Sequence, residues 1–200
     1  MSVAFDAVYL ERQVKRSGLR RLVRQFYLRR HRRLCCGPTL DFGCGAGDLL
    51  ALLPQGSAGF EINPHAVAHA RAHGLEIVSF GADADAPDLP GIAPGRFETL
   101  FCGHVLEHLD DPSVIARRLL DAAHARRIAR VVFVVPGHRG FQHDGTHRQF
   151  VTRARFEREG LIDPPGWRLR EVSYFPGNAR WLGDYLTHHE LTIVHERVSA

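Results

Sequence analysis

The residues best suited to chemistry begin in a short glycine-rich turn at positions 40–47 (LDFGCGAG). Glycines at alternate positions let the chain turn sharply and bring backbone N–H groups against a ligand where a Cβ would block approach. A dinucleotide fingerprint needs a third glycine three positions after the second, to seat a pyrophosphate on a helix N-terminus. Asp48 stands there instead of glycine, which counts against a nicotinamide cofactor and an oxidoreductase.

A second acidic residue, Glu61, ends the next apolar run at positions 57–61, twenty residues after Asp41. A carboxylate at the end of a second strand can accept hydrogen bonds from both hydroxyls of a ribose. Nicotinamide and adenosyl cofactors both carry a ribose, so Glu61 does not choose between them. The glycine spacing makes that choice.

Histidines follow a later apolar run in the segment 101–112 (FCGHVLEHLDDP) and recur at 141–150 (FQHDGTHRQF). The unperturbed pKa of histidine, about 6.5, suits proton transfer near neutral pH. We expect His104 to be the first candidate for a general base, with His143 and His147 behind it.

The neighbouring Glu107 and His108 have two interpretations. They could line a site, or they could only cap or brace a helix. His147 could likewise only tie down its loop through hydrogen bonds.

Thirteen histidines also raise the question of a metal. The spacing of His143 and His147 puts two ligands on one face only in a helix, which Gly145 disfavours. No cysteine or carboxylate set completes this pair or the pair His188-His189, so we expect no metal site. His188 and His189 are expected on an exposed loop or strand edge.

Strand-like and helix-like runs alternate along the chain, which indicates βαβ units around a parallel sheet. Asn63 before Pro64, and Asp111 before Pro112, are typical of helix starts with a capping side chain and a proline in the first turn. A loop is expected at 136–147. The predicted helices cover 49–53, 64–73, 114–125 and 153–159, and the predicted strands cover 39–42, 58–61, 76–80, 99–102, 131–135, 168–174 and 191–198.

The 200 residues, 44% of them apolar, suffice for one domain with a real core, expected at 37–200. The preceding segment 1–36 is basic: nine arginines and Lys15 lie between Arg12 and Arg33. A solvated amphipathic helix explains this segment, and so does a face for nucleic acid, anionic lipid or an acidic partner. No aromatic cluster supports nucleic-acid binding.

The four cysteines show no metal-ligand spacing, so we expect free thiols in a reducing cytoplasm. The sequence begins with no charged-then-apolar leader, and it has no run of about 18 apolar residues that would suit a membrane span. Neither secretion nor insertion in a membrane is therefore expected.

Taken together, the glycine turn with Asp41 and the later Glu61 resemble motif I and the following acidic motif of class I S-adenosylmethionine-dependent methyltransferases. The segment 101–112 resembles the fourth motif of small-molecule members, such as methyltransferase-like proteins of quinone and methionine biosynthesis. The resemblance implies a Rossmann-like α/β fold: a doubly wound sheet of seven strands, mostly parallel, with an antiparallel C-terminal strand.

The same resemblance implies S-adenosylmethionine as the cofactor, with Asp41 near its ammonium group. Asp83 is expected at the adenine amino group, and Asp85 is the alternative in another register. A short N-terminal segment covers the cofactor in some relatives, which places Tyr9 near the methionine end or the substrate. The alternative for Tyr9 is an aromatic residue that packs against a helix. The implied cofactor contacts are Asp41, Gly43, Cys44, Gly45, Glu61, Ile62, Asp83, Cys102 and Gly103, and the implied substrate contacts are Tyr9, Glu107 and His108.

The expected reaction is methyl transfer to an oxygen, carbon or nitrogen of a small metabolite. Oxygen or carbon is favoured because no Asn-Pro-Pro-Tyr-type motif follows the fourth strand, and the arginine-rich loops suit an anionic substrate. Two alternatives stay open: a non-catalytic methyltransferase-like subunit that serves a protein partner, and the less favoured nicotinamide oxidoreductase.

Overall fold

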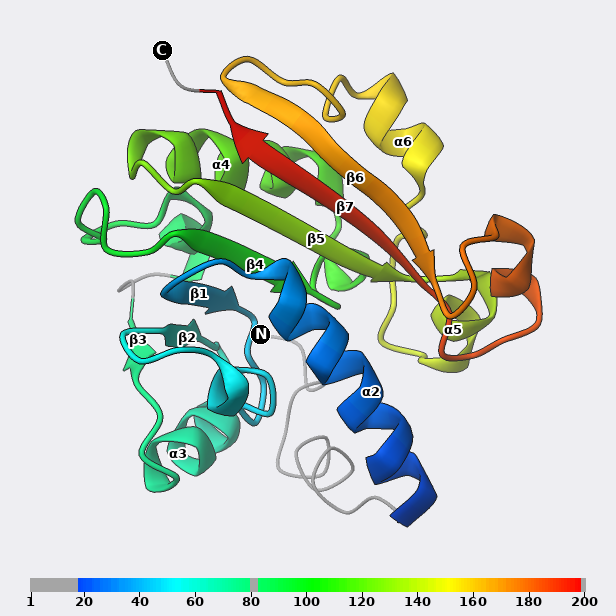
Figure 1. The fold of residues 1–200 in the computed structure, drawn as a ribbon, viewed down its shortest axis with the longest axis horizontal. Helices are drawn as coiled ribbons and strands as arrows, with labels where there is room; N and C mark the ends of the chain where they lie inside the picture. Colours follow the sequence, from blue (N-terminus) through cyan, green and yellow to red (C-terminus); the bar gives the residue numbers. More distant parts are fainter. Residues whose placement is uncertain (1–17, 80–82, 199–200) are drawn as a thin grey trace.

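The computed structural model describes residues 18–79 and 83–198, which form one seven-stranded sheet with helices on both faces (Figure 1). The strand order is β3-β2-β1-β4-β5-β7-β6, and β7 alone runs in the direction opposite to the other six strands. This confirms the predicted sheet. The strands are β1 (Thr39–Phe42), β2 (Ala58–Phe60), β3 (Ile77–Val78), β4 (Thr99–Gly103), β5 (Arg130–Pro136), β6 (Trp167–Phe175) and β7 (Glu190–Arg197).

Successive residues of the central strands face opposite sides of the sheet, and both sides are buried. Phe133 of β5 packs in the larger core with residues of α4 (Pro112–Ala125) and α6 (Arg153–Arg158). Val132 and Val134 pack on the other side with α2 (Gly18–Leu34). Burial on both faces explains the continuous apolar run in β5.

The two predicted helix starts are confirmed. The Asn63 side chain accepts a hydrogen bond from the His65 amide (3.0 Å) at the start of α3 (Pro64–Ala72), and that of Asp111 accepts one from the Val114 amide (3.2 Å) at the start of α4. Both caps satisfy amides that have no partner within the helix. They fix where each crossover begins.

Two segments differ from the predicted elements. The expected helix at 49–53 is a single 3₁₀ turn, η1 (Leu50–Leu52), because Leu53 precedes Pro54 and takes an extended conformation with ψ 159°. The expected loop at 136–147 contains α5 (His138–His143). Gly140 permits this helix, since a Cβ there would lie 2.6 Å from the carbonyl oxygen of Thr187.

Helix α2 lies against the same sheet as the rest of the chain (Figure 1). Arg30 donates hydrogen bonds to the hydroxyls of Thr192 in β7 and Ser173 in β6, each at 2.8 Å. Part of the basic charge of α2 is therefore used inside the fold, and the domain boundary at residue 36 stays a prediction. Among the described residues, no helix combines the length and apolar character needed to cross a bilayer.

Candidate active site

A cavity of about 1180 Å³ opens at the carboxyl ends of the parallel strands, where the order reverses between β1 and β4. Ligands of open α/β sheets bind at this switch point. Most of the predicted site residues that the structure describes line the cavity: Asp41, Gly43, Cys44, Gly45, Glu61, Ile62, Gly103, His104, His108, His143 and His147.

The glycine turn lies at the floor of this cavity. The amides of Gly43 and Cys44 both donate to the carbonyl of Phe60, at 2.8 and 3.0 Å, which ties the turn to β2. Gly43 has φ +80°, and a Cβ there would lie 2.3 Å from a methyl carbon of Val105. Only glycine fits this position, so the backbone stays open to a ligand.

Glu61 connects the turn to the end of β2. Its Oε2 accepts a hydrogen bond from the Gly45 amide, and its Oε1 accepts from the amides of Ile62 and Asn63, all at 2.8 Å. The side chain of Ile62 is 52% exposed and lines the cavity, so it is not a core residue. A ribose beside Glu61 and an adenine against Ile62 fit this arrangement.

Asp41 lies one residue before the end of β1, with its side chain almost fully buried. Burial, together with the nearby charge of Glu61, raises its pKa to about 7, and the charge of Arg24 of α2 opposes the shift. A buried carboxyl in this state gains from a cation placed beside it. The ammonium group of an amino-acid ligand supplies that cation, so the residues present fit S-adenosylmethionine.

His104 follows β4 and lies between two carboxylates. Its Nδ1 is 3.2 Å from Oε1 of Glu107, and its Nε2 is 2.8 Å from Oε1 of Glu190. Burial alone lowers its pKa, but the two hydrogen-bonded carboxylates raise it to about 10. His104 is therefore a cation with both ring nitrogens donating. This does not fit the general base predicted from the sequence, which needs an unprotonated nitrogen.

Glu190 and His31 were not predicted as site residues. Glu190, at the start of β7, also contacts Nε2 of His31 in α2 at 3.0 Å. Burial works against its charge, yet His31 and His104 hold its pKa at about 2. Both residues lie far along the chain from the motifs. The signal that could have found Glu190 is its charge at the start of an apolar strand.

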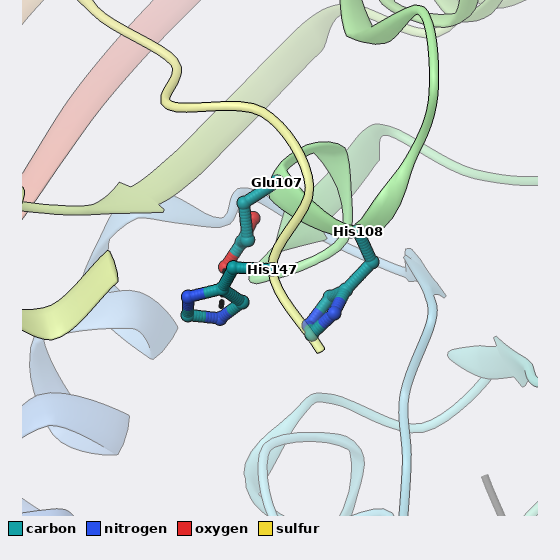
Figure 2. Close-up of side chains that lie close together, drawn as sticks. All are labelled: Glu107, His108 and His147. Carbon is teal, nitrogen blue, oxygen red and sulfur yellow. Dashed lines mark ion pairs between the residues drawn. The ribbon is translucent and has the colours of Figure 1, made fainter. Parts of the chain in front are cut away.

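His108 and His147 also line the cavity, and we call these two residues the wall of histidines; Figure 2 shows their rings close to Glu107. Glu107 and His108 belong to the turn η3 (Leu106–His108), and His147 follows α5. The rings of His108 and His147 lie 4.8 Å apart between centroids. Burial lowers the pKa of His108. Glu107 lies beneath this wall with a fully buried side chain, so it supports the cavity and is not among its lining residues.

The other predicted residues differ in their placement. Cys102 points into the core from β4 with no exposed surface, so its thiol does not contact the cavity. His188 and His189 both line the cavity; His188 is exposed, whereas His189 is buried and its Nε2 hydrogen-bonds to the carbonyl of Ala179 at 3.1 Å. Tyr9 and the side chains of Asp83 and Asp85 lie outside the part that the structure describes.

Comparison with known proteins agrees with this geometry. The family model of a methyltransferase domain matches residues 8–196. A ubiquinone biosynthesis O-methyltransferase of Xanthomonas euvesicatoria is 35% identical over 103 residues, which cover 48% of this chain and 42% of the relative. The chain thus spans about two fifths of the length of the curated relatives it matches.

Two solved structures share the fold. A SAM-dependent methyltransferase from Archaeoglobus fulgidus has a TM-score of 0.65 at 19% identity, covering 96% of this chain and 100% of that one. A magnesium protoporphyrin IX methyltransferase from Synechocystis PCC 6803 with bound SAH has a TM-score of 0.66 at 15% identity, covering 97% and 96%. With its family model matched over nearly all its length, the chain belongs to the class I S-adenosylmethionine-dependent methyltransferase family, and the nicotinamide alternative is set aside.

Proposed function

We propose that this protein transfers a methyl group to an oxygen of a small molecule. The observation that carries the proposal is the cavity itself, which joins the glycine turn and Glu61 to the wall of histidines. Its volume of about 1180 Å³ accommodates a cofactor together with a small acceptor. The O-methyltransferase relatives support oxygen as the acceptor atom.

The chain's own residues hold the reactants in line. S-adenosylmethionine held by these residues would supply a methyl group on a sulfonium, and transfer to oxygen would leave the electron pair of the broken C–S bond on sulfur. Positioning supplies most of the catalysis of such a displacement. Asp41, the glycine turn and Glu61 orient one partner, and the histidine wall orients the acceptor.

His143 is the proposed acceptor of the proton that leaves the hydroxyl. It lines the cavity at the end of α5 and is exposed, so it can pass the proton on to solvent. His104 is a less suitable proton acceptor, because both of its ring nitrogens are held by carboxylates. Its side chain is 44% exposed and lines the cavity, so it can contact the acceptor. Asp83 and Tyr9 stay proposed contacts of the adenine and the substrate.

The test is transfer of a labelled methyl group from S-adenosylmethionine to a panel of catechols, phenols and aromatic carboxylates. We expect turnover with a hydroxyl acceptor, a large loss of turnover in His143→Ala, and no effect in Glu76→Ala, which changes an acid paired with Arg96 on the surface. Binding of S-adenosylhomocysteine without turnover on any acceptor, together with a stoichiometric copurifying protein, would establish the non-catalytic subunit instead.

A reducing cytoplasm is the proposed location, supported by four cysteines that are all free. A nucleic-acid substrate is disfavoured, because Arg24 and Arg30 of the basic helix form ion pairs with Asp48 and Glu171 of the same chain. The remaining exposed arginines leave room for an acidic protein partner.

A further inference from the structure

The wall of histidines contains a candidate ligand set that the sequence did not indicate. One ligand atom from each of Glu107, His108 and His147 lies within 4.8 Å of the others, and Figure 2 shows the carboxylate and the two rings gathered around one space. Glu107 and His108 come from η3, whereas His147 comes from the segment after α5. Two turns far apart in the chain thus bring three metal-binding groups together.

Oxygen atoms that contact Nδ1 orient both histidine rings. Nδ1 of His147 donates to the carbonyl of Phe141 at 2.8 Å, and the ring stacks on that of Phe141. Nδ1 of His108 lies 3.1 Å from the hydroxyl of Thr146 and 3.3 Å from its carbonyl. A ring nitrogen facing a carbonyl carries the hydrogen, which leaves Nε2 as the lone-pair nitrogen. Metal-binding histidines are oriented in this way.

The carboxylate of Glu107 is an independent indication of a missing cation. The side chain has no exposed surface, and its Oε2 has no hydrogen-bond partner among the described residues. His104 reaches only Oε1 and shares its charge with Glu190. Nε2 of His147 lies 3.9 Å from Oε1, too far for a hydrogen bond. A buried carboxylate oxygen left in this state is costly unless a cation joins it.

We propose that Glu107, His108 and His147 bind a divalent transition-metal ion of the zinc type. Two imidazoles and one carboxylate suit this class better than magnesium or calcium, which prefer oxygen ligands. In tetrahedral coordination at about 2.0–2.2 Å the ligand atoms lie about 3.4 Å apart, so the most widely separated of them must approach by at most about 1.4 Å when the ion binds. The segments that carry them are a three-residue turn and a loop, which allow that closure.

The ion would face the cavity, because His108 and His147 line it. An open coordination position there takes the hydroxyl oxygen of the acceptor and lowers its pKa, while the proton leaves to His143. This role, unlike the binding itself, rests on the proposed function. The set also differs from the histidine pairs considered in the sequence: His147 lies with Glu107 and His108, and not with His143.

The experiment titrates chelator-stripped protein with Zn²⁺, using a competing dye, and with Co²⁺, using its visible absorption. We expect one ion per chain and at least a tenfold loss of affinity in Glu107→Gln and in His147→Gln. The matched control is His69→Ala/His73→Ala. The rings of these two histidines lie 4.3 Å apart between centroids at the end of α3 and form a rival chelate, so their removal should leave the affinity for the metal unchanged.

Binding of S-adenosylhomocysteine is measured on the same proteins as a check of folding. Absence of stoichiometric binding would overturn the proposal, and so would wild-type affinity in both ligand variants or a loss confined to the α3 control. If Zn²⁺ binding depends on Glu107 and His147 but no adenosyl ligand binds, the metal site stands and the proposed function fails.

Discussion

The pKa of Asp41 leads to a specific dependence of cofactor affinity on pH. The buried carboxyl has a pKa of about 7 in the free protein, and only its ionised form can pair with the ammonium group of the ligand. The ionised fraction rises from about one in thirty at pH 5.5 to about one half at pH 7.0. The ligand's own amino group stays mostly protonated over this range. The association constant should therefore rise about fifteenfold.

The assay is calorimetric titration of S-adenosylhomocysteine at several pH values. Asp41→Asn removes the titrating group while keeping the shape, so its affinity should be lower at pH 7 and nearly constant between pH 5.5 and 7. Glu61 and Arg24 are the charged groups that shift the pKa of Asp41. The reasoning is refuted if wild-type affinity is flat over this window, or if Asp41→Asn shows the same slope.

The same shift acts on folding in the absence of ligand. Because the pKa of Asp41 is higher in the folded chain than its ordinary 3.8, the folded state binds the proton more tightly. The free protein then loses stability as pH rises from about 4 to about 7. At pH 8 the free energy of unfolding of Asp41→Asn, measured with urea, should exceed that of wild type by at most about 4 kcal/mol. This difference should vanish below pH 4.

Three further substitutions test the rest of the site. Glu61→Ala removes the acceptor of three backbone hydrogen bonds and should weaken S-adenosylhomocysteine binding about a hundredfold by calorimetry, with Glu76→Ala unchanged. Gly43→Ala should lower the free energy of unfolding in urea by about 3 kcal/mol through strain and contact with Val105, whereas Gly74→Ala, with φ +76° and open space, should cost about 1 kcal/mol. His104→Ala leaves Glu107 and Glu190 without their shared cation and should lower the free energy of unfolding by about 3 kcal/mol at pH 7. Substitution of the exposed His65 by alanine should change it little.

Each of these has an outcome that counts against it. Equal affinities of Glu61→Ala and wild type would show that the carboxylate only braces the turn. If Gly43→Ala and Gly74→Ala lose the same stability, the close approach to Val105 is unimportant. A His104→Ala protein as stable as wild type would mean that the two carboxylates do not depend on the imidazolium.

Much of the fold could be predicted because its rules are local or periodic. The run Val131–Val135 has the continuous apolar character of a strand buried on both faces, and β5 contains it. Asn63-Pro64 and Asp111-Pro112 combine a capping side chain with a fixed proline φ, and both helices begin there. The short elements were predicted less well. Pro54 limits the length of η1, and α5 depends on Gly140, which has no Cβ to clash with Thr187.

By itself the sequence determined the parts of the site that are contiguous in the chain. The glycine turn, Asp41 and Glu61 follow from residue type and from the positions where apolar runs end, because the carboxyl ends of parallel strands share one edge of the sheet. Only the tertiary structure decided what surrounds them. It places Glu190 between His31 and His104, and His147 beside Glu107 and His108, which turns an expected base into a cation and forms a candidate metal site. Charge and coordination depend on distances of a few ångströms between segments far apart in the chain, and no sequence spacing encodes those distances.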